Sequence, residues 1–491
     1  MKPFLVIVFA VSALAASGPT APPAADQAIV HVLNRAGFGP RADDIERVRG
    51  IGIQRYIDEQ LRPDRIPDTG MNARLAGLET IRMSSRQIAD EIERPQIEAR
   101  RERKLQAKDD VPATEPRMPD PLQQKANGVI VELSEQKLLR AVYSERQLQE
   151  VLTDFWFNHF NVDARKGRDR FLLTEYERDT IRPRVLGTFL DLLEATAKSP
   201  AMLFYLDNWM SADPNGPHLQ SENAGRRFHR RPGWPEGLGL RRSAAPQPRP
   251  QGKNAPKGLN ENYGRELMEL HTLGVDGGYT QRDVIEVARA FTGWTIENPR
   301  QGGGFKFEPR IHDPGEKIVL GHIIKAGGGE SDGERVLDIL AAHPSTARLI
   351  ATKLARRFVS DTPPPALVDR AAKRFRETGG DLREVTRTIL TSPEFLSPDA
   401  YRAKVKTPFE FVVSALRASG ADVADARPLV REVQQLGMPL YMCQPPTGYK
   451  DTADAWVNTG ALVSRMNFAL KLASNDHDLA LTLGSPEFQR R

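Results

Sequence analysis

Apolar residues recur at helical spacing along most of the chain. Near its start, Ile29, Val32 and Leu33 share one helical face before the glycines of NRAGFGP interrupt the pattern. Two shorter helices are expected at 43–48 and 53–61. The helical period then returns in four longer segments, which are 128–160, 182–208, 334–396 and the stretch after Pro408. These periods predict a mainly α protein.

A different pattern occupies residues 300–330. Apolar and polar residues alternate there between runs of glycine, which predicts a small β-hairpin or two short strands near 305–325. The preceding stretch, TQRDVIEVARAFTGWTI, has the pattern of an amphipathic helix, and Thr280 and Asp283 suit its start. The expected fold is one large helical domain, from 28 to 475, with a small β element.

Two segments within that domain lack the apolar residues of a packed core. Residues 107–122 and 211–258 are rich in proline, glycine or charge, which predicts flexible, disordered insertions. Between 226 and 257, nine Lys or Arg and one Glu give a local charge of +8, so the rest of the +5 chain sums to −3. The basic charge therefore belongs to one segment, which argues against a nucleic-acid-binding surface on the folded body. The segment is either solvated or a contact for an anionic partner, such as a polysaccharide or an envelope phosphate.

The N-terminal stretch MKPFLVIVFAVSALAASGPTA has a different composition. A lysine at the start, an apolar run and a small-x-small site predict a signal peptide over 1–17, with an uncleaved anchor as the alternative. No second long apolar run follows, so no transmembrane span is expected after signal removal, and a periplasmic or extracellular location is expected. The single cysteine, Cys443, excludes an intramolecular disulfide and a cysteine-rich zinc site.

Polar residues are concentrated in GLNENYGRELMELHTLGVDGGYT, at 258–280. Asn262, Glu266 and Glu269 form an i, i+4, i+7 line that could bind hydroxyl groups or a cation. Arg265 is a candidate substrate-binding residue, or it can pair with carboxylates one turn away, as on an ordinary solvated face. His271 lies on the apolar side, either as a packed core histidine or as a functional one. No carboxylate precedes it by three or four residues, which excludes a Glu-x-x-His metal pair.

The ends of the same helix are also marked in the sequence. Asn260 suits the position before the first turn, and Gly274 suits the position after the last. The helix is therefore expected to run between them.

A second histidine lies in LTDFWFNHFNVD. His159 shares a helical face with apolar residues, whereas Asp154 and Asn158 lie one turn apart on the other side. Two inward histidines from separate helices could line one pocket with Asp154 as a substrate-binding residue. The alternative is that His159 belongs to an aromatic core.

Two further polar motifs lie near turns. His312 and Asp313 in HDPGEKIVLG could serve acid–base chemistry or bind a metal, or could form a turn with the following Pro-Gly. Asn208, in YLDNWMS, is a candidate substrate-binding residue or a helix-end cap.

Several nucleotide, hydrolase and metalloprotease signatures are absent from the chain. It has no G-x-S-x-G elbow, P-loop, H-E-x-x-H or dinucleotide-binding glycine fingerprint. The sequence therefore assigns no cofactor and leaves the presence of a metal undetermined.

Together these stretches resemble the bacterial family called domain of unknown function 1800. The resemblance spans about 28 to 475, and NENYGRELMELHTLG is its most specific motif, with HVLNRAGFGP, LTDFWFNHFNV, SPAMLFYLDN and HPSTARLIATKLARRFV beside it. Other members commonly carry a Trp-Pro-Gly-type loop near the C-terminus, where this chain has Gly448-Tyr449-Lys450. The resemblance implies an exported, mainly helical bacterial protein. Genes of the family often lie beside genes for an exported sulfatase-related family, which implies envelope or polysaccharide work by association alone.

Three functional hypotheses remain at this point. The first is an exported enzyme acting on carbohydrate or another envelope polymer, with His159, His271, Glu266, His312 and Asp313 as catalytic candidates lining one pocket. The second is a non-catalytic binding or assembly partner of a co-exported enzyme. The third is a metal-dependent enzyme with histidine and carboxylate ligands from different helices.

Overall fold

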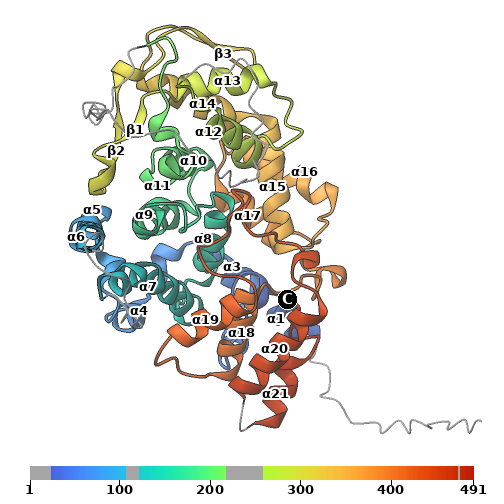
Figure 1. The fold of residues 1–491 in the computed structure, drawn as a ribbon. Helices are drawn as coiled ribbons and strands as arrows, with labels where there is room; N and C mark the ends of the chain where they lie inside the picture. The colour runs from blue at the N-terminus through green and yellow to red at the C-terminus, as the bar shows by residue number, and fades with distance from the viewer. Residues whose placement is uncertain (1–23, 107–120, 217–257, 474–475) are drawn as a thin grey trace, which may run out of the picture.

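The computed structural model describes residues 24–106, 121–216, 258–473 and 476–491, and these residues form a mainly α architecture (Figure 1). The mainly α fold predicted from the sequence is thus confirmed. The predicted signal peptide and most of both predicted insertions lie outside the described residues. Pro121, expected in the first insertion, begins helix α7.

The first half of the chain supplies eleven of the described helices. They are α1 (Ala24–Arg35), α2 (Asp44–Ile51), α3 (Ile53–Gln60), α4 (Thr69–Arg74), α5 (Ser85–Ile88), α6 (Arg94–Gln106), α7 (Pro121–Tyr143), α8 (Gln147–His159), α9 (Asp169–Glu175), α10 (Phe189–Ala197) and α11 (Pro200–Tyr205). The segment with helical period at 128–160 contains part of α7 and all of α8, and the segment at 182–208 contains α10 and α11. Ser199 lies at the break between α10 and α11.

The second half supplies the remaining helices and the strands. The helices are α12 (Glu261–Glu266), α13 (Gln281–Ala290), α14 (Glu330–Ala342), α15 (Pro344–Phe358), α16 (Pro365–Glu377), α17 (Leu382–Leu390), α18 (Pro408–Ser419), α19 (Arg427–Gln435), α20 (Thr459–Leu472) and α21 (His477–Gly484). In Figure 1, α18–α21 lie at one end of the molecule and the strands at the other.

The strands form two small antiparallel sheets. β3 (Lys317–Val319) and β4 (His322–Ile324) make the hairpin predicted near 305–325. β2 (Phe305–Phe307) instead pairs with β1 (Trp294–Ile296), which lies inside the segment expected to be helical. That helix, α13, ends at Ala290 because Gly293 adopts a φ of +82°, which turns the chain out of the helix. The predicted start is correct, since Thr280 and Asp283 form a capping box.

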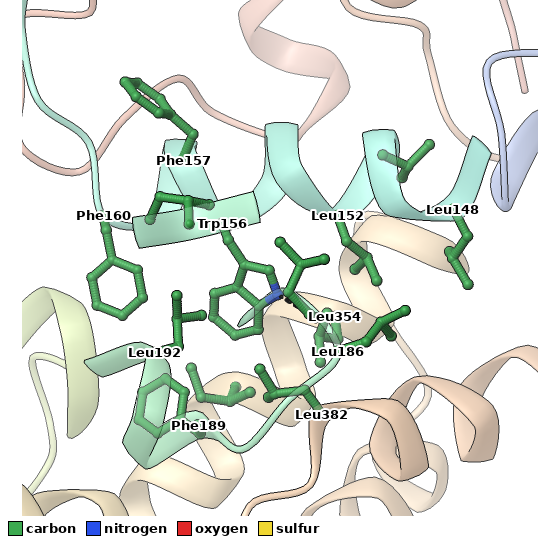
Figure 2. Close-up of a cluster of buried hydrophobic side chains, with 14 of the residues drawn as sticks. Leu148, Leu152, Trp156, Phe157, Phe160, Leu186, Phe189, Leu192, Leu354 and Leu382 are labelled. Atoms are coloured by element: carbon green, nitrogen blue, oxygen red, sulfur yellow. Dashed lines mark hydrogen bonds between the residues drawn. The ribbon is translucent and has the colours of Figure 1, made fainter. Parts of the chain in front are cut away.

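The apolar stripe of α8 anchors the centre of the core (Figure 2). Leu148, Leu152 and Trp156 lie one turn apart and are buried. They pack among side chains of neighbouring elements, including Phe189, Leu192, Leu354 and Leu382. The Trp156 indole also donates a hydrogen bond of 3.2 Å to the Val185 carbonyl. Burying each such side chain contributes about 2 kcal/mol, so α8 is held rigidly and its polar last turn is held with it.

The conspicuous polar helix of the sequence begins as expected and then changes form. The Asn260 side chain accepts a 2.9 Å hydrogen bond from the Asn262 N–H, which makes it the cap of α12. Gly274, with a φ of +87°, follows the last turn. Between them, Leu267–Thr272 forms a turn of π-helix, a form that is rare and often lies at functional sites.

Among the described helices, none has the length and apolar character needed to cross a membrane.

Candidate functional site

His159 joins two helices that are far apart in the sequence. Its Nε2 atom lies 3.1 Å from the carbonyl oxygen of His271, and its Nδ1 atom lies 2.8 Å from the Lys353 Nζ. A carbonyl oxygen can only accept, so Nε2 carries the ring proton. Nδ1 is then the acceptor, and Lys353 donates to it. The tautomer of His159 is therefore set by the His271 backbone. The lone pair on Nδ1 of His159 then orients Lys353.

His271 contributes its backbone carbonyl to the hydrogen bonds of His159. Its carbonyl lies in the π-helical turn at the helix end, where the last carbonyls have no partner within the helix. The His271 ring packs against Phe160, at a centroid distance of 5.0 Å, and against His159, at 6.1 Å. Burial and, after it, the charge of Lys353 lower the pKa of His271 to about 3, so the ring is neutral at physiological pH.

Lys353 lies on α15 with its amine largely removed from water. Burial, followed by repulsion from Arg356, lowers its pKa to about 8. Burial also lowers the pKa of His159 well below its usual range, with the charge of Lys353 as a smaller cause. His159 therefore stays a neutral acceptor, while Lys353 is an amine that gains and loses a proton close to physiological pH.

Lys353 and His159 lie at the wall of a cavity of about 420 Å³. Arg356 adds a second cation from the next turn of α15, and its Nε donates 3.1 Å to the Asp361 carbonyl. The rings of Phe155 and Tyr449 add apolar surface to the same cavity. The rest of the wall carries hydroxyl, amide and charged groups. They belong to Asn158, Thr447, Lys450, Asp451 and Thr452. A cavity of this size, with cationic groups beside aromatic rings, fits a small organic anion or one unit of a polymer.

The loop that closes this cavity is held by the last turn of α8. Asn158 exchanges two hydrogen bonds of 2.7 Å with the backbone of Tyr449, accepting its N–H and donating to its carbonyl. Asn161 donates 2.9 Å hydrogen bonds to the carbonyls of Cys443 and Pro445. The motif FNHFN thus positions the loop at 443–452 as well as Lys353.

Gly448 is required for that close approach. Its φ is +71°, and a Cβ at this position would lie 2.2 Å from the carbonyl oxygen of Asn158. The Tyr449 hydroxyl donates 2.8 Å to the Pro439 carbonyl, so the ring has a defined position in the wall. In the Gly448-Tyr449-Lys450 sequence noted as a family variation, Tyr449 and Lys450 line the cavity and Gly448 allows the loop to approach α8.

Asp154 lies behind the cavity, in a buried ionic cluster. It is 2.8 Å from Lys137 and 3.8 Å from Arg357, and the Lys137 and Arg357 side chains are almost fully covered. Arg357 also lies 2.7 Å from Glu410. Asp154 therefore stabilises the packing of α8, α7 and α15, and is not part of the cavity wall.

Two of the predicted residues lie at a separate, more open cleft of about 590 Å³. Asn262 and Glu266 line it together with Asp163, Arg165, Lys166 and Tyr205. Burial, and then the charge of Glu269, raise the pKa of Glu266.

The neighbours of Glu266 on its helix have ordinary surface roles. Glu269 accepts a hydrogen bond of 3.3 Å from the Tyr279 hydroxyl. Arg265 donates to Gln281 at 2.8 Å and lies 3.6 Å from Glu261. These contacts are those of a solvated face, the alternative to substrate binding by Arg265.

His312 and Asp313 belong to a third place. The ring of His312 bonds to the Thr292 carbonyl at 2.8 Å and lies 3.2 Å from Asp332, which also pairs with the fully buried Lys317 at 2.7 Å. Asp313 pairs with Arg289 through hydrogen bonds of 2.7 and 3.1 Å. This network ties the β3–β4 hairpin to α13 and α14.

Asn208 also has a packing role. Its side-chain amide donates to the carbonyls of Phe291, at 3.2 Å, and Trp294, at 3.1 Å. It therefore fixes the turn between α13 and β1.

The expectation that the catalytic candidates line one pocket is wrong. The structure brings His159 and His271 together but places Glu266 at the open cleft, and it places His312 and Asp313 in the hairpin network. Within the described ranges, no group of three or more His, Cys, Asp or Glu side chains could hold a metal ion. His159 is satisfied by the His271 carbonyl and by Lys353, and His312 by the Thr292 carbonyl and the single carboxylate of Asp332.

Sequence reasoning missed Lys353, Arg356 and Tyr449. The lysine and the arginine lie in HPSTARLIATKLARRFV, one of the motifs that carry the family resemblance, and this was the available signal. A lysine in an amphipathic helix is usually solvated, and only the packing of α15 beside α8 buries this one.

The fold and cavity define a helical protein with a buried lysine–histidine pair. The chain belongs to the family described as protein of unknown function (DUF1800), whose model matches residues 31–490. Comparison with curated proteins and with solved structures gave no significant match.

Proposed function

We propose that the protein is an exported enzyme that acts on an acidic carbohydrate or related envelope polymer, with Lys353 as its proton acceptor. The observation that carries the proposal is the 2.8 Å contact between the Lys353 Nζ and His159 Nδ1 at the wall of the cavity. A general base works best when its pKa lies near the operating pH, and a lysine requires burial to reach that range.

The cavity supplies the other groups that such a reaction requires. Arg356 has no hydrogen bond from its two terminal nitrogens to the described residues, so it is available for a substrate carboxylate. The rings of Phe155 and Tyr449 can cover the apolar face of a sugar. Thr447 and Thr452 add hydroxyl groups that suit a polyhydroxylated ligand.

The reaction class that fits these groups is β-elimination. Lys353 removes the proton from the carbon that bears the carboxylate, while Arg356 neutralises that carboxylate. The electron pair forms a double bond to the next carbon, the bond from that carbon to the glycosidic oxygen breaks, and the oxygen leaves with a proton from water. No redox partner is required, and the lysine returns its proton to solvent.

The proposal is tested with purified protein and a panel of uronic-acid polysaccharides. The readout is the ultraviolet absorbance of the unsaturated product, compared between wild type and Lys353→Met. A matched control is Lys373→Met, because Lys373 lies on α16 with a side chain that is 70% exposed. We expect product from wild type and from the control, and a loss of at least about 100-fold in Lys353→Met.

The possible results separate an enzyme from a binding protein. Binding of a polysaccharide without product in any variant would contradict catalysis and would favour the non-catalytic alternative. Equal product from Lys353→Met and wild type would remove Lys353 from the mechanism. Export is tested separately, by N-terminal sequencing of the protein recovered from the periplasm or medium of an expressing bacterium; cleavage near residue 17 is expected.

A further inference from the structure

A second, smaller cavity lies between α1, α18 and the C-terminal segment. Its volume is about 130 Å³, and His31, Ser414, Lys406, Phe488 and Arg491 are among the residues that line it. A water molecule takes up about 30 Å³ in the liquid, so the cavity has room for a small polyatomic ligand. It is separate from the cavity at Lys353, and the two share no lining residue.

Lys406 is buried at this cavity without a carboxylate partner. It is 3% exposed, and no carboxylate oxygen of the described residues lies within 4.0 Å of its amine. Its Nζ lies 3.7 Å from the centroid of the Phe488 ring, which is a cation–π contact. The charged groups that act on it are Glu410 and three cations, Arg402, Arg465 and Arg491. Glu487 also lines the cavity from its exposed side, but the cations around Lys406 outnumber the carboxylates.

Glu410 cannot neutralise Lys406 because it is already engaged. Its Oε1 lies 2.7 Å from Arg357 and 3.1 Å from Arg491. Its Oε2 accepts the N–H of Thr407 at 2.9 Å. One carboxylate thus serves two buried guanidinium groups and a helix cap.

Several buried donors beside the cavity also lack acceptors. The Nε atom of Arg491 makes no hydrogen bond within the described parts of the chain, and that side chain is 2% exposed. Arg35, on α1, donates from Nη2 to the carbonyls of Val359 and Ala400, but its Nε and Nη1 have no partner there. A buried cation or donor without a partner is costly, so this cluster lacks an acceptor.

We propose that the cavity binds a small oxyanion, such as sulfate, phosphate or a carboxylate, between Lys406 and Arg491. Charge-assisted hydrogen bonds from both side chains would satisfy donors that the protein leaves unpaired. Arg490 and Glu487 are both exposed at the same cavity and carry opposite charges, so the attraction for the anion comes from the buried cations. The bound oxyanion ties the C-terminal segment to α1 and α18, which is a role independent of any reaction at Lys353.

The experiment uses full-length protein dialysed into chloride. The thermal midpoint is measured against added sulfate, phosphate or acetate at constant ionic strength, and heats of binding are measured in two buffers with different ionisation enthalpies. We expect a saturable rise of several degrees with at least one oxyanion. Burial lowers the pKa of Lys406 to about 7, and an adjacent anion raises it, so binding near neutral pH takes up protons.

Three variants decide whether the effect belongs to this site. Lys406→Met should abolish the saturable rise, Lys406→Arg should retain it, and Lys373→Met should behave as wild type. Binding of all three oxyanions without saturation, or equal shifts in Lys406→Met and wild type, would overturn the proposal. If Lys406→Met does not fold, the wild-type titration decides: one site with proton uptake supports the proposal, and absence of binding heat overturns it.

Discussion

The amine of Lys353 donates to Nδ1 of His159 across 2.8 Å, although the two residues are 194 positions apart in the sequence. The opposite ring nitrogen of His159 donates to the His271 carbonyl. A backbone carbonyl, an imidazole and an amine therefore form one chain of hydrogen bonds that ends at the cavity. Each member fixes the proton position of the next, which gives the lysine a single orientation.

The lowered pKa of Lys353 predicts how stability depends on pH. Its folded pKa is about 8, against about 10.4 for an unfolded lysine. Between these values the unfolded state binds more protons, so the free energy of unfolding should rise with pH across this window. Lys353→Met removes the penalty, and we expect it to be more stable than wild type by about 2–3 kcal/mol at pH 7. That advantage should shrink as the pH approaches 10.

Urea unfolding of both proteins at pH 7 and pH 10 measures the difference. Lys373→Met serves as control, because Lys373 is exposed on α16. An advantage of Lys353→Met that does not change between the two pH values would show that the lysine titrates normally.

The turn at Gly448 predicts a difference between two glycine substitutions. Gly448→Ala places a Cβ 2.2 Å from the Asn158 carbonyl oxygen, in addition to the strain of a φ of +71°. Gly437, with a φ of +95°, has open space around its Cβ position. We expect Gly437→Ala to lose about 1 kcal/mol from backbone strain alone. Gly448→Ala should lose at least about 2 kcal/mol, since the loop must also move away from α8.

Denaturant unfolding of the two variants gives both values under one condition. Equal losses would mean that the 443–452 loop relaxes freely, and that Asn158 does not hold it.

Local signals in the sequence were sufficient for the starts of α12 and α13 and for the fold class. Asn260 caps α12, and Thr280 and Asp283 form the box that begins α13, because capping depends only on residues two or three positions apart. The strand β1 was missed because its partner, β2, lies beyond a turn, and short strands take their stability from such pairing.

The candidate site was only partly predictable, for a physical reason. His159 and His271 could be placed on apolar faces, and the structure brings their rings to 6.1 Å. The π-helical turn that aims the His271 carbonyl has no recognised sequence pattern, and the burial of Lys353 depends on how α15 packs on α8. Contacts between distant segments, such as Asn158 with Tyr449, are invisible to helical periodicity.

Removing one charge from the buried ionic cluster is expected to reduce the free energy of unfolding strongly. Glu410 pairs with Arg357 and Arg491, and all three side chains are at most 5% exposed. Glu410→Gln leaves two buried guanidinium groups without their shared carboxylate, and we expect a loss of about 3–5 kcal/mol. The matched surface change is Asp369→Asn, whose partner Arg348 lies 2.7 Å away with both side chains more than 60% exposed. That change should alter stability by less than about 1 kcal/mol.

Free energies of unfolding at one pH compare the two substitutions directly. A loss near that of Asp369→Asn would indicate that water enters the cluster and replaces Glu410. The same result would count against an unmet need for an acceptor at Lys406 and Arg491.

The buried histidine His271 predicts sensitivity to acid. Burial lowers its pKa to about 3, against about 6.5 in the unfolded chain. As the pH falls from 6.5, only the unfolded state binds the proton, so the stability contributed by the neutral ring is lost progressively. His271→Phe keeps an aromatic ring beside Phe160 and leaves the backbone carbonyl in place for His159. The variant should therefore lose about 2 kcal/mol less stability than wild type between pH 7 and pH 4.5. Urea unfolding at both pH values tests this, and parallel losses in the two proteins would show that the ring is protonated in the folded state.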